Sequence, residues 1–210
     1  PRLSPEMRTA MAEAAVALVR QERYRGAGTI EFVIDADSDE FYFLEMNTRI
    51  QVEHPVTEMT TALDLVALQI QLARGDDLTS LTQASIVSRG HAIEARIYAE
   101  NPDKNFLPSP GSLTRFDLPP EMNGLRIDTG VRRGDPITFH YDPMIAKVIC
   151  HGSSRVDAID RLVAALGETR VEGVATNIPF LRRVLDHPAF RAGDSFTGFI
   201  TAYTTDLLRG

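Results

Sequence analysis

The sequence FYFLEMNTRIQVEHPVTE occupies Phe41–Glu58. From Glu45 onward every second side chain is polar, and these positions are Glu45, Asn47, Arg49, Gln51 and Glu53. The residues between them are Met46, Thr48, Ile50 and Val52. Alternate side chains of an extended chain point to opposite faces. The pattern therefore predicts a strand that carries two carboxylates, two amides and a guanidinium along one face.

A half-buried strand with a solvated outer face would give the same alternation, and it is the simpler interpretation. Solvated faces commonly contain Lys, Ser and Thr, whereas the polar positions of this segment include no Lys. A complementary strand also precedes it. These two observations favour a functional face.

The complementary strand is Gly28–Asp35, which reads GTIEFVID. Its apolar and polar positions alternate, and the polar loop at residues 36–40 is short enough for a hairpin. If Asp35 pairs with Phe41, then Glu31 lies opposite Glu45. The same register predicts that Thr29 lies opposite Asn47.

Two opposed carboxylates need a compensating charge. Directly opposed side chains have Cβ atoms about 5 Å apart, and two like charges at that distance repel by roughly 3 kcal/mol at an effective dielectric constant near 20. A cation between Glu31 and Glu45 removes this cost. Oxygen ligands with Asn47 nearby favour Mg²⁺ or Mn²⁺ over Zn²⁺. Mg²⁺ held by one or two carboxylates usually takes its other ligands from water and substrate phosphates.

The run EMNTRIQVEHPVTEM at residues 45–59 resembles the signature of the biotin carboxylases, which are ATP-grasp ligases. GAGTIEF before it, and FLPSPG and YDPMIAKVI after it, resemble the same family in the same order. The resemblance covers essentially the whole chain. It implies an α+β fold, in which residues 1–80 are the C-terminal part of an ATP-grasp domain. Residues 81–210 would then form a mixed α/β biotin carboxylase C-terminal domain with a mainly antiparallel sheet.

The resemblance also implies a reaction. Biotin carboxylases use ATP to phosphorylate bicarbonate, and the carboxyphosphate formed releases CO₂ beside a deprotonated biotin. Glu31, Glu45 and Asn47 match the metal ligands that hold ATP in this family. The family's N-terminal domain, glycine-rich lid and ATP-binding lysines would lie upstream of Pro1, so we expect this chain alone to be inactive.

Five further residues match family positions with a role in catalysis or binding. Glu53 matches the base that removes the bicarbonate proton. Arg49 matches the cation that holds bicarbonate and then the biotin enolate, tasks that suit a planar guanidinium. Gln51 and the Val52 backbone match further bicarbonate contacts, and Arg96 matches the arginine that meets the biotin ureido group. From the residues alone, a surface ion pair of Arg96 with Glu94 or Glu100 is the favoured interpretation.

Three functions stay open at this point. The first is part of a biotin carboxylase, which catalyses the first half-reaction of an acetyl-, propionyl- or methylcrotonyl-CoA type carboxylase. The second is another ATP-grasp ligase, such as a carbamoyl-phosphate synthase, which also uses a Glu-x-Asn metal pair. The third is a non-catalytic assembly module. The run RIQVEHP at residues 49–55 favours the first.

Composition and family resemblance together give expected cofactors, partners and location. The cofactors implied are ATP, Mg²⁺ or Mn²⁺, and biotin on a carrier domain. The partners implied are that carrier domain, a carboxyltransferase domain or subunit, and a second copy in a dimer. A net charge of −7 argues against a nucleic-acid partner, and the sequence has no apolar run of membrane-spanning length. Cys150 is the only cysteine, which fits a reducing compartment, and we expect a cytoplasmic location, or the mitochondrial matrix in a eukaryote.

Local signals predict the remaining elements. Ser4-Pro5-Glu6 predicts a helix start, with the helix ending near Tyr24, and Gly75 predicts the end of one long helix over residues 57–74. Predicted strands cover residues 91–98, 113–116, 125–129, 137–141 and 145–150. Predicted helices cover residues 154–166 and 176–185, with another near the C-terminus. In the helix at 154–166 the expected apolar side is Val156, Ile159, Leu162, Val163 and Leu166.

Overall fold

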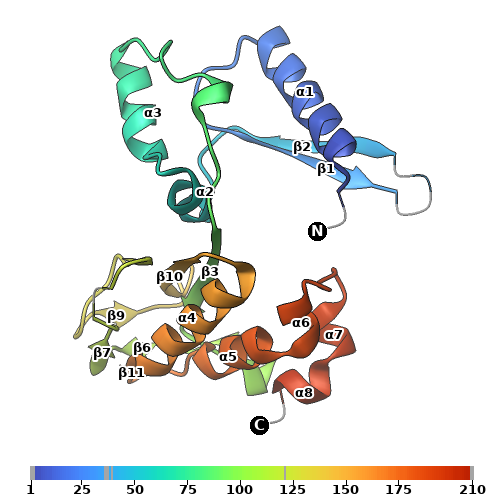
Figure 1. Ribbon diagram of the computed structural model, residues 1–210. Coiled ribbons are helices and arrows are strands. Elements are labelled where there is room, and N and C mark those ends of the chain that lie inside the picture. Colours follow the sequence, from blue (N-terminus) through green and yellow to red (C-terminus); the bar gives the residue numbers. More distant parts are fainter. Residues whose placement is uncertain (1–2, 36–37, 39, 121, 209–210) are drawn as a thin grey trace. The chain divides into compact units, whose positions relative to one another are not determined.

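The computed structural model describes residues 3–35, 38, 40–120 and 122–208 (Figure 1). The chain divides into two compact units, of which the first comprises Pro1–His54 and Ala62–Ile86. The second comprises Pro55–Thr61 and Val87–Gly210. Helices and strands occur in both units and every strand pair is antiparallel, which confirms the expected α+β class.

The described residues of unit 1 form two helices, one hairpin and a short 3-10 turn. Its elements are α1 (Pro5–Gln21), β1 (Thr29–Ile34), β2 (Phe41–Asn47), α3 (Leu65–Arg74) and η1 (Gln83–Ser85). The predicted start of α1 is confirmed, because the Ser4 hydroxyl accepts a hydrogen bond from the Met7 amide at 3.1 Å. The predicted end of α3 is also confirmed, because Gly75 adopts the left-handed conformation with φ 85°.

The β1–β2 hairpin has the predicted register at one end and a different register at the other. Thr29 pairs with Asn47 and Glu31 pairs with Glu45, as predicted. The predicted pairing of Asp35 with Phe41 is wrong, because the register shifts after Glu31 and Ile34 pairs with Phe41 instead. A bulge of this kind places an extra residue in one strand. Of the predicted loop, residues 36, 37 and 39 lie outside the described part of the chain.

The second strand is shorter than the alternation predicts. β2 ends at Asn47, so the expected single extended face from Glu45 to Glu53 is wrong beyond Asn47. The partner strand β1 begins at Thr29, directly opposite Asn47, and Gly26 before it has φ 135°. Strand geometry is not maintained past Asn47 because no residue of β1 pairs with the chain beyond this point.

The predicted single helix over residues 57–74 is also wrong. The structure has two helices, α2 (His54–Thr61) and α3, with Ala62 at φ 58° between them. Asp64 starts the second helix, because its carboxylate accepts a hydrogen bond from the Ala67 amide at 2.8 Å. An Asp at this position favours a helix start over a helix interior.

Unit 2 is built on a three-stranded sheet in the order β3-β10-β8. These strands are β3 (His91–Tyr98), β10 (Met144–Gly152) and β8 (Leu125–Asp128). Short strand pairs lie around it: β4 (Glu100–Asn101) with β5 (Leu107–Pro108), β6 (Gly111–Ser112) with β9 (Pro136–Ile137), and β7 (Arg115–Asp117) with β11 (Arg170–Glu172). The other elements are η2 (Pro102–Lys104), α4 (Arg155–Glu168), α5 (Ile178–Asp186), α6 (Pro188–Ala192), α7 (Phe199–Ala202) and α8 (Thr204–Leu208).

The core of unit 2 lies between its central sheet and helix α4. Ile159, Leu162 and Leu166 of α4 are fully buried and pack with Ile97 and Val148 of the sheet. The prediction for the apolar side of this helix fails at Val156, which is half exposed at the first turn.

One predicted strand of unit 2 is mostly absent. Of residues 137–141 only Ile137 belongs to a strand, β9. Phe139 and Tyr141 are 73% and 84% exposed. Their alternation with polar neighbours therefore does not reflect a buried strand face.

Burial differs sharply between the two units. Among the described residues, none of unit 1 is fully buried, and every buried residue belongs to unit 2. Unit 1 exposes several large apolar side chains, including Val33, Phe43, Leu44 and Ile70. Unit 2 therefore has a hydrophobic core of its own, whereas unit 1 has only partly buried contacts.

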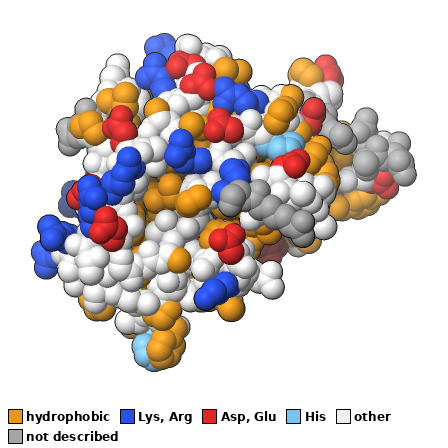
Figure 2. All heavy atoms as spheres, turned by 90° about the horizontal axis from the view of Figure 1, so that it is seen from below, with side chains coloured by type: hydrophobic (Ala, Val, Ile, Leu, Met, Phe, Trp, Pro, Cys, Tyr) orange, Lys and Arg blue, Asp and Glu red, His pale blue; other side chains and the backbone are white. Residues whose placement is uncertain are grey.

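The surface carries both signs of charge. On the face shown in Figure 2, Lys and Arg side chains lie among Asp, Glu and exposed apolar side chains. Among the described residues, no helix combines the length and the apolar character needed to cross a bilayer.

Candidate functional site

The open end of the β1–β2 hairpin brings three of the predicted metal ligands together. Glu31 and Glu45 are directly opposed, and Asn47 lies one alternate position beyond Glu45 on the same strand. Asn47 Nδ2 donates to Glu31 Oε1 at 3.0 Å and to Glu45 Oε1 at 3.1 Å. One amide nitrogen thus bridges two carboxylates and reduces the repulsion between them.

This arrangement fits a magnesium or manganese ion better than a zinc ion. Among the described residues there is no cluster of three or more His, Cys, Asp and Glu side chains suited to a metal. Two carboxylates with one amide form a smaller oxygen set, which suits Mg²⁺ completed by water and phosphate oxygens. Binding through Asn47 requires its Oδ1 to face the ion, which the amide can do by rotating its terminal group.

The next predicted residues follow the end of strand β2. Arg49 is exposed, and its guanidinium donates to the Ile50 carbonyl at 3.2 Å and to Asn47 Oδ1 at 3.4 Å. The planar group is therefore held beside Asn47, one of the predicted metal ligands, within unit 1. The guanidinium has five N–H donors, and these two contacts involve two of them, so the exposed group has donors available for a planar anion.

Gln51, Val52 and Glu53 form the turn that leads into helix α2. The Gln51 carbonyl accepts from the His54 amide at 3.2 Å and lies 2.7 Å from His54 Nδ1. Glu53 is exposed and immediately precedes the helix. Gln51, Val52 and Glu53 therefore lie in a turn and not in the predicted strand.

The eighth predicted site residue, Arg96, lies in unit 2 on strand β3. Its Nε donates to Glu94 Oε1 at 3.3 Å, so the ion pair that the sequence offered as an alternative is present. The Glu94 side chain is only 5% exposed, whereas that of Arg96 is 37% exposed. The pair leaves the guanidinium accessible and gives the buried carboxylate a cationic partner.

Arg96 belongs to a charged row on the sheet. Lys147 of β10 lies opposite Arg96 on one side and opposite Asp128 of β8 on the other. Its Nζ lies 3.2 Å from Asp128 Oδ2, and Lys147 is nearly fully buried. Lys147 and Arg96 are like charges on neighbouring strands, and the carboxylate of Asp128 offsets the repulsion between them.

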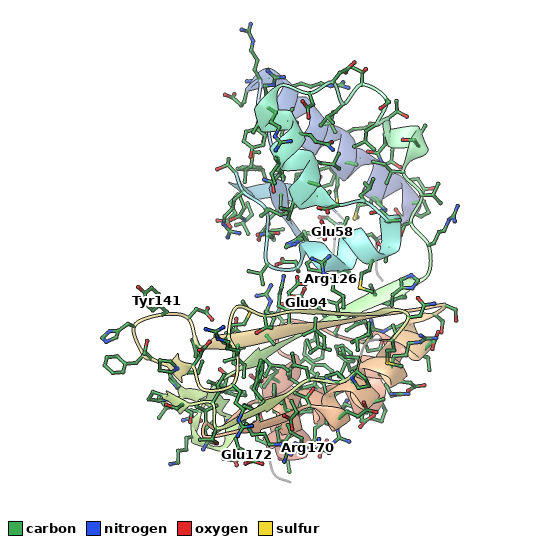
Figure 3. All side chains as sticks on the ribbon, turned by 90° about the vertical axis from the view of Figure 1, so that its left-hand side faces the viewer. Glu58, Glu94, Arg126, Tyr141, Arg170 and Glu172 are labelled. Carbon is green, nitrogen blue, oxygen red and sulfur yellow. The ribbon has the colours of Figure 1, made fainter. Side chains whose placement is uncertain are left out.

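A second anion reaches this row from helix α2. Arg126 donates twice to Asp128, at 2.8 and 3.0 Å, and its Nη1 lies 2.5 Å from Glu58 Oε2 (Figure 3). Glu58 is 6% exposed. Burial alone would raise the pKa of Asp128, but hydrogen bonds from Arg126 and Lys147 hold it below its ordinary value. The hydrogen bonds to Asp128 and Glu58 outweigh burial and raise the pKa of Arg126.

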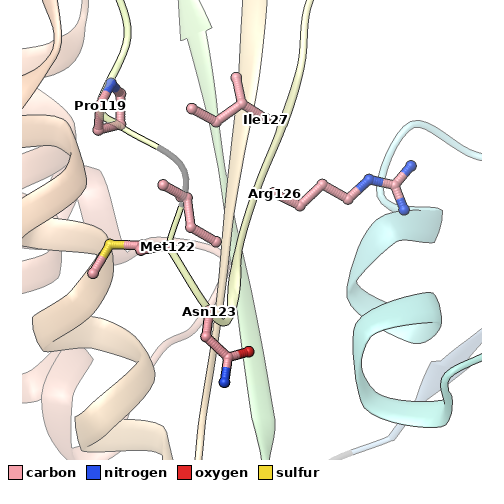
Figure 4. Close-up of a pocket in the computed structure, with 6 residues that line it drawn as sticks. Pro119, Met122, Asn123, Arg126 and Ile127 are labelled. Atoms are coloured by element: carbon pink, nitrogen blue, oxygen red, sulfur yellow. The ribbon is translucent and has the colours of Figure 1, made fainter.

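A pocket of about 550 Å³ lies at strand β8. It is lined by Pro119, Met122, Asn123, Leu125, Arg126 and Ile127 (Figure 4). In the close-up the Arg126 side chain leads away from Pro119 and Met122, toward helix α2. Arg126 thus lines the pocket and also forms the ion pairs with Asp128 and Glu58, and polar and apolar groups share the lining.

Sequence reasoning missed Glu58, Arg126, Asp128 and Lys147. Arg126 and Asp128 alternate within a predicted strand, which signals a polar sheet face. Nothing local to Glu58 separates it from an exposed glutamate of a surface helix. Its burial arises from packing with residues about 70 positions later in the chain.

The chain matches two protein families in succession. Residues 94–202 match the family described as biotin carboxylase C-terminal domain. Residues 1–81 match the family described as carbamoyl-phosphate synthase L chain, ATP binding domain.

Curated relatives and a solved structure extend this match over nearly the whole chain. The mitochondrial methylcrotonoyl-CoA carboxylase subunit alpha of Rattus norvegicus is 48% identical over 208 residues, which is 99% of this chain and 29% of that protein. Biotin carboxylase 1 of Bacillus subtilis (strain 168) is 48% identical over 203 residues, which is 97% of this chain and 45% of that protein. The biotin carboxylase domain of the Hydrogenobacter thermophilus 2-oxoglutarate carboxylase, in complex with MgADP and bicarbonate, has a TM-score of 0.92 at 39% identity. That comparison covers 98% of this chain and 45% of the other. The chain thus spans less than half the length of each of these three proteins.

Proposed function

The chain belongs to the biotin carboxylase family, and on that premise we propose that it supplies part of the active site of an ATP-dependent biotin carboxylase. The observation that carries the proposal is the opposed pair Glu31 and Glu45, bridged by Asn47 and followed directly by the segment from Arg49 to Glu53. The reaction is the carboxylation of carrier-bound biotin by bicarbonate. It is the first half-reaction of an acyl-CoA carboxylase.

Glu31, Glu45 and Asn47 hold the divalent ion in this proposal. Magnesium or manganese neutralises charge on the ATP phosphates when it is bound. The residues of this chain fix the position of the triphosphate relative to the bicarbonate site, and their three oxygen donors suit that ion. Positioning and charge neutralisation are the main contributions that a protein makes to phosphoryl transfer.

Arg49, Gln51, Val52 and Glu53 act on bicarbonate. Glu53 takes the bicarbonate proton, and its exposed position at the turn leaves the carboxylate accessible. The Arg49 guanidinium binds the anion and later the enolate oxygen of biotin. Gln51 and the Val52 backbone orient bicarbonate.

Arg96 binds the ureido group of biotin. Its guanidinium is the accessible partner of the Glu94 pair, which limits its motion without covering it. A planar guanidinium with several donors suits the planar ureido group.

The competing functions are weaker. A carbamoyl-phosphate synthase shares the ATP-binding half of the site, and residues 1–81 match the family named after that enzyme. The match of residues 94–202 and the relatives of both bacterial and mitochondrial origin favour biotin as the acceptor. An assembly role without catalysis does not explain why two carboxylates are opposed and bridged by Asn47. It also does not explain why Arg49 and Glu53, which follow them in the chain, are exposed.

The wider assignments follow from the same proposal. The boundary between the two family domains lies near residue 80, and the partners are a biotin carrier domain, a carboxyltransferase domain or subunit and a second copy of the enzyme. The compartment is the cytoplasm or, in a eukaryote, the mitochondrial matrix. Methylcrotonyl-, propionyl- and acetyl-CoA are the acceptor class.

The test uses the complete carboxylase that contains this chain. ATP, Mg²⁺ and labelled bicarbonate should yield labelled carboxybiotin from free biotin, and Arg96→Ala should lower this yield strongly while bicarbonate-dependent ATP hydrolysis without biotin continues. Arg133→Ala is the matched control, because Arg133 is an exposed arginine that donates to the Thr114 carbonyl, away from the Arg96 row. Formation of carbamoyl phosphate from ammonia, with no carboxybiotin, would overturn the proposal in favour of its alternative.

A further inference from the structure

Asn177 occupies a position where an asparagine is expected to cap a helix. It precedes α5 as the N-cap residue, and a side-chain oxygen at that position normally accepts from the first turn of the helix. Here the side chain makes no capping hydrogen bond. Asn177 is nonetheless only 4% exposed, so its amide serves another part of the fold.

The Asn177 side-chain amide forms hydrogen bonds with the outer edge of strand β3. Asn177 Oδ1 accepts from the Tyr98 amide at 2.9 Å, and Nδ2 donates to the Arg96 carbonyl at 3.1 Å. The Asn177 backbone amide donates to the Tyr98 carbonyl at 3.3 Å. In the central sheet β3 pairs only with β10. The side chain therefore provides, at Arg96 and Tyr98, the hydrogen bonds that a further strand would provide.

The same amide reaches a carboxylate beyond the strand. Burial raises the pKa of Glu100, and a hydrogen bond from Asn177 counteracts part of that rise. Asn177 thus contacts the backbone of Arg96, the backbone of Tyr98 and the side chain of Glu100. These contacts fix the path of the chain from the Arg96 carbonyl onward.

We propose that Asn177 is a positioning residue for Arg96. By holding the edge of β3 through hydrogen bonds, Asn177 fixes the position of the Arg96 guanidinium relative to biotin. The inference rests on the proposed role of Arg96 in binding biotin. The β3 strand is held on its other edge by β10, so Asn177 and β10 together constrain the backbone at Arg96. A displacement of about 1 Å in a positioning group is enough to reduce catalysis strongly.

Two variants separate positioning from folding. Asn177→Ala removes all the side-chain hydrogen bonds. Asn177→Asp keeps the acceptor for the Tyr98 amide but loses the donors, and it places a carboxylate beside the Arg96 carbonyl and Glu100. Asn101→Ala is the control, because it removes an asparagine whose Oδ1 accepts locally from the Asp103 amide at 3.0 Å.

The kinetic readout is the KM for biotin in the complete carboxylase. Asn177→Ala and Asn177→Asp should each raise this KM by about tenfold, because a misplaced Arg96 guanidinium binds biotin less well. Biotin-independent ATP hydrolysis should stay within about twofold of the parent enzyme, because its substrates do not contact Arg96. In an Arg96→Ala background, Asn177→Ala should raise the KM no further.

A structural readout uses the 210-residue chain. Hydrogen exchange at the Tyr98 amide should accelerate in Asn177→Ala and should keep part of its protection in Asn177→Asp. Equal loss of both activities, or an unchanged KM for biotin alongside an impaired Arg96→Ala, would overturn the positioning role. An unchanged KM for biotin in Arg96→Ala itself would overturn the proposed role of Arg96 in binding biotin. Hydrogen exchange at the Tyr98 amide distinguishes this failure from a failure of the positioning role, because it measures the β3 edge without any contribution from biotin.

Discussion

Glu58 Oε2 and Arg126 Nη1 lie 2.5 Å apart, and they join helix α2 to strand β8 within unit 2. Arg126 also holds Asp128, two residues later on its own strand. An equivalent arrangement occurs elsewhere in the unit, where Arg115 holds Asp117 two residues later and Glu172 from another strand. The two clusters differ mainly in burial, which makes them a natural matched pair.

We predict that Glu58→Ala destabilises unit 2 by roughly 2–3 kcal/mol, because it leaves Arg126 without its buried partner. Glu172→Ala should cost only about 0–1 kcal/mol, as is usual for exposed ion pairs. Glu172 lies well away from Glu58 (Figure 3). Urea unfolding of the chain and of both variants gives the comparison. Equal free-energy losses would show that burial of Glu58 adds nothing to the ion pair.

The metal proposal predicts a changed ion requirement. Glu31→Gln or Glu45→Gln in the complete carboxylase should raise the Mg²⁺ or Mn²⁺ concentration for half-maximal ATP use by roughly tenfold or more, because affinity depends on the charge of the ligand set. Glu13→Gln, on the exposed side of α1, should leave the requirement unchanged. An identical metal dependence in all three variants would contradict a shared cation.

Much of this end of the hairpin could be predicted from the sequence, for a simple reason. Alternation fixes which residues share a face, and the predicted opposition of Glu31 and Glu45 is present. It depends on the bulge, because the pairing of Ile34 with Phe41 would otherwise place Leu44 opposite Glu31. The bulge after Glu31 could not be predicted, because inserting one residue leaves the hydrophobic pattern of each strand unchanged. The end of β2 at Asn47 was also missed, since it depends on where the partner strand begins.

Long-range contacts explain the residues that the sequence did not reveal. Glu58 is buried by a strand that is distant in the sequence, and Asn177 forms hydrogen bonds with Arg96 and Tyr98 about 80 positions earlier. Local rules predict a surface glutamate and a helix cap at these two positions. In the folded chain the Glu58 side chain instead binds Arg126 of β8, and the Asn177 side chain binds the backbone of β3.

Arg49 and Glu53 should affect different steps in the complete enzyme. Glu53→Gln removes a general base, so bicarbonate-dependent ATP hydrolysis should fall by about 10²- to 10⁴-fold. Arg49→Lys retains the charge but loses the planar fork, so turnover should fall strongly while ATP affinity changes little. Steady-state rates with ATP and bicarbonate as varied substrates measure both effects. Near-normal hydrolysis in Glu53→Gln would place the base elsewhere.

The 210-residue chain on its own should fold in unit 2 and catalyse nothing. Unit 2 buries its own core, whereas no described residue of unit 1 is fully buried. Glu31, Glu45 and Asn47 give a metal–nucleotide complex few contacts, so MgADP should bind only weakly. Calorimetric titration with MgADP, beside an assay with ATP, Mg²⁺, bicarbonate and free biotin, provides the measurement. Micromolar MgADP affinity or measurable carboxybiotin would contradict this expectation.

Cys150 offers a direct probe of the folded core. It lies in the central strand β10, is 1% exposed, and burial raises the pKa of its thiol to about 11. A thiol reagent at pH 8 should therefore react with the native chain only through unfolding, because the reactive thiolate is both buried and disfavoured. Above pH 9 the unfolded chain releases a proton that the folded chain retains, so the stability of unit 2 should fall as the pH rises from about 9 to 11. Cys150→Ala should remove this part of the pH dependence, and rapid labelling of the native chain at pH 8 would show that β10 is not protected.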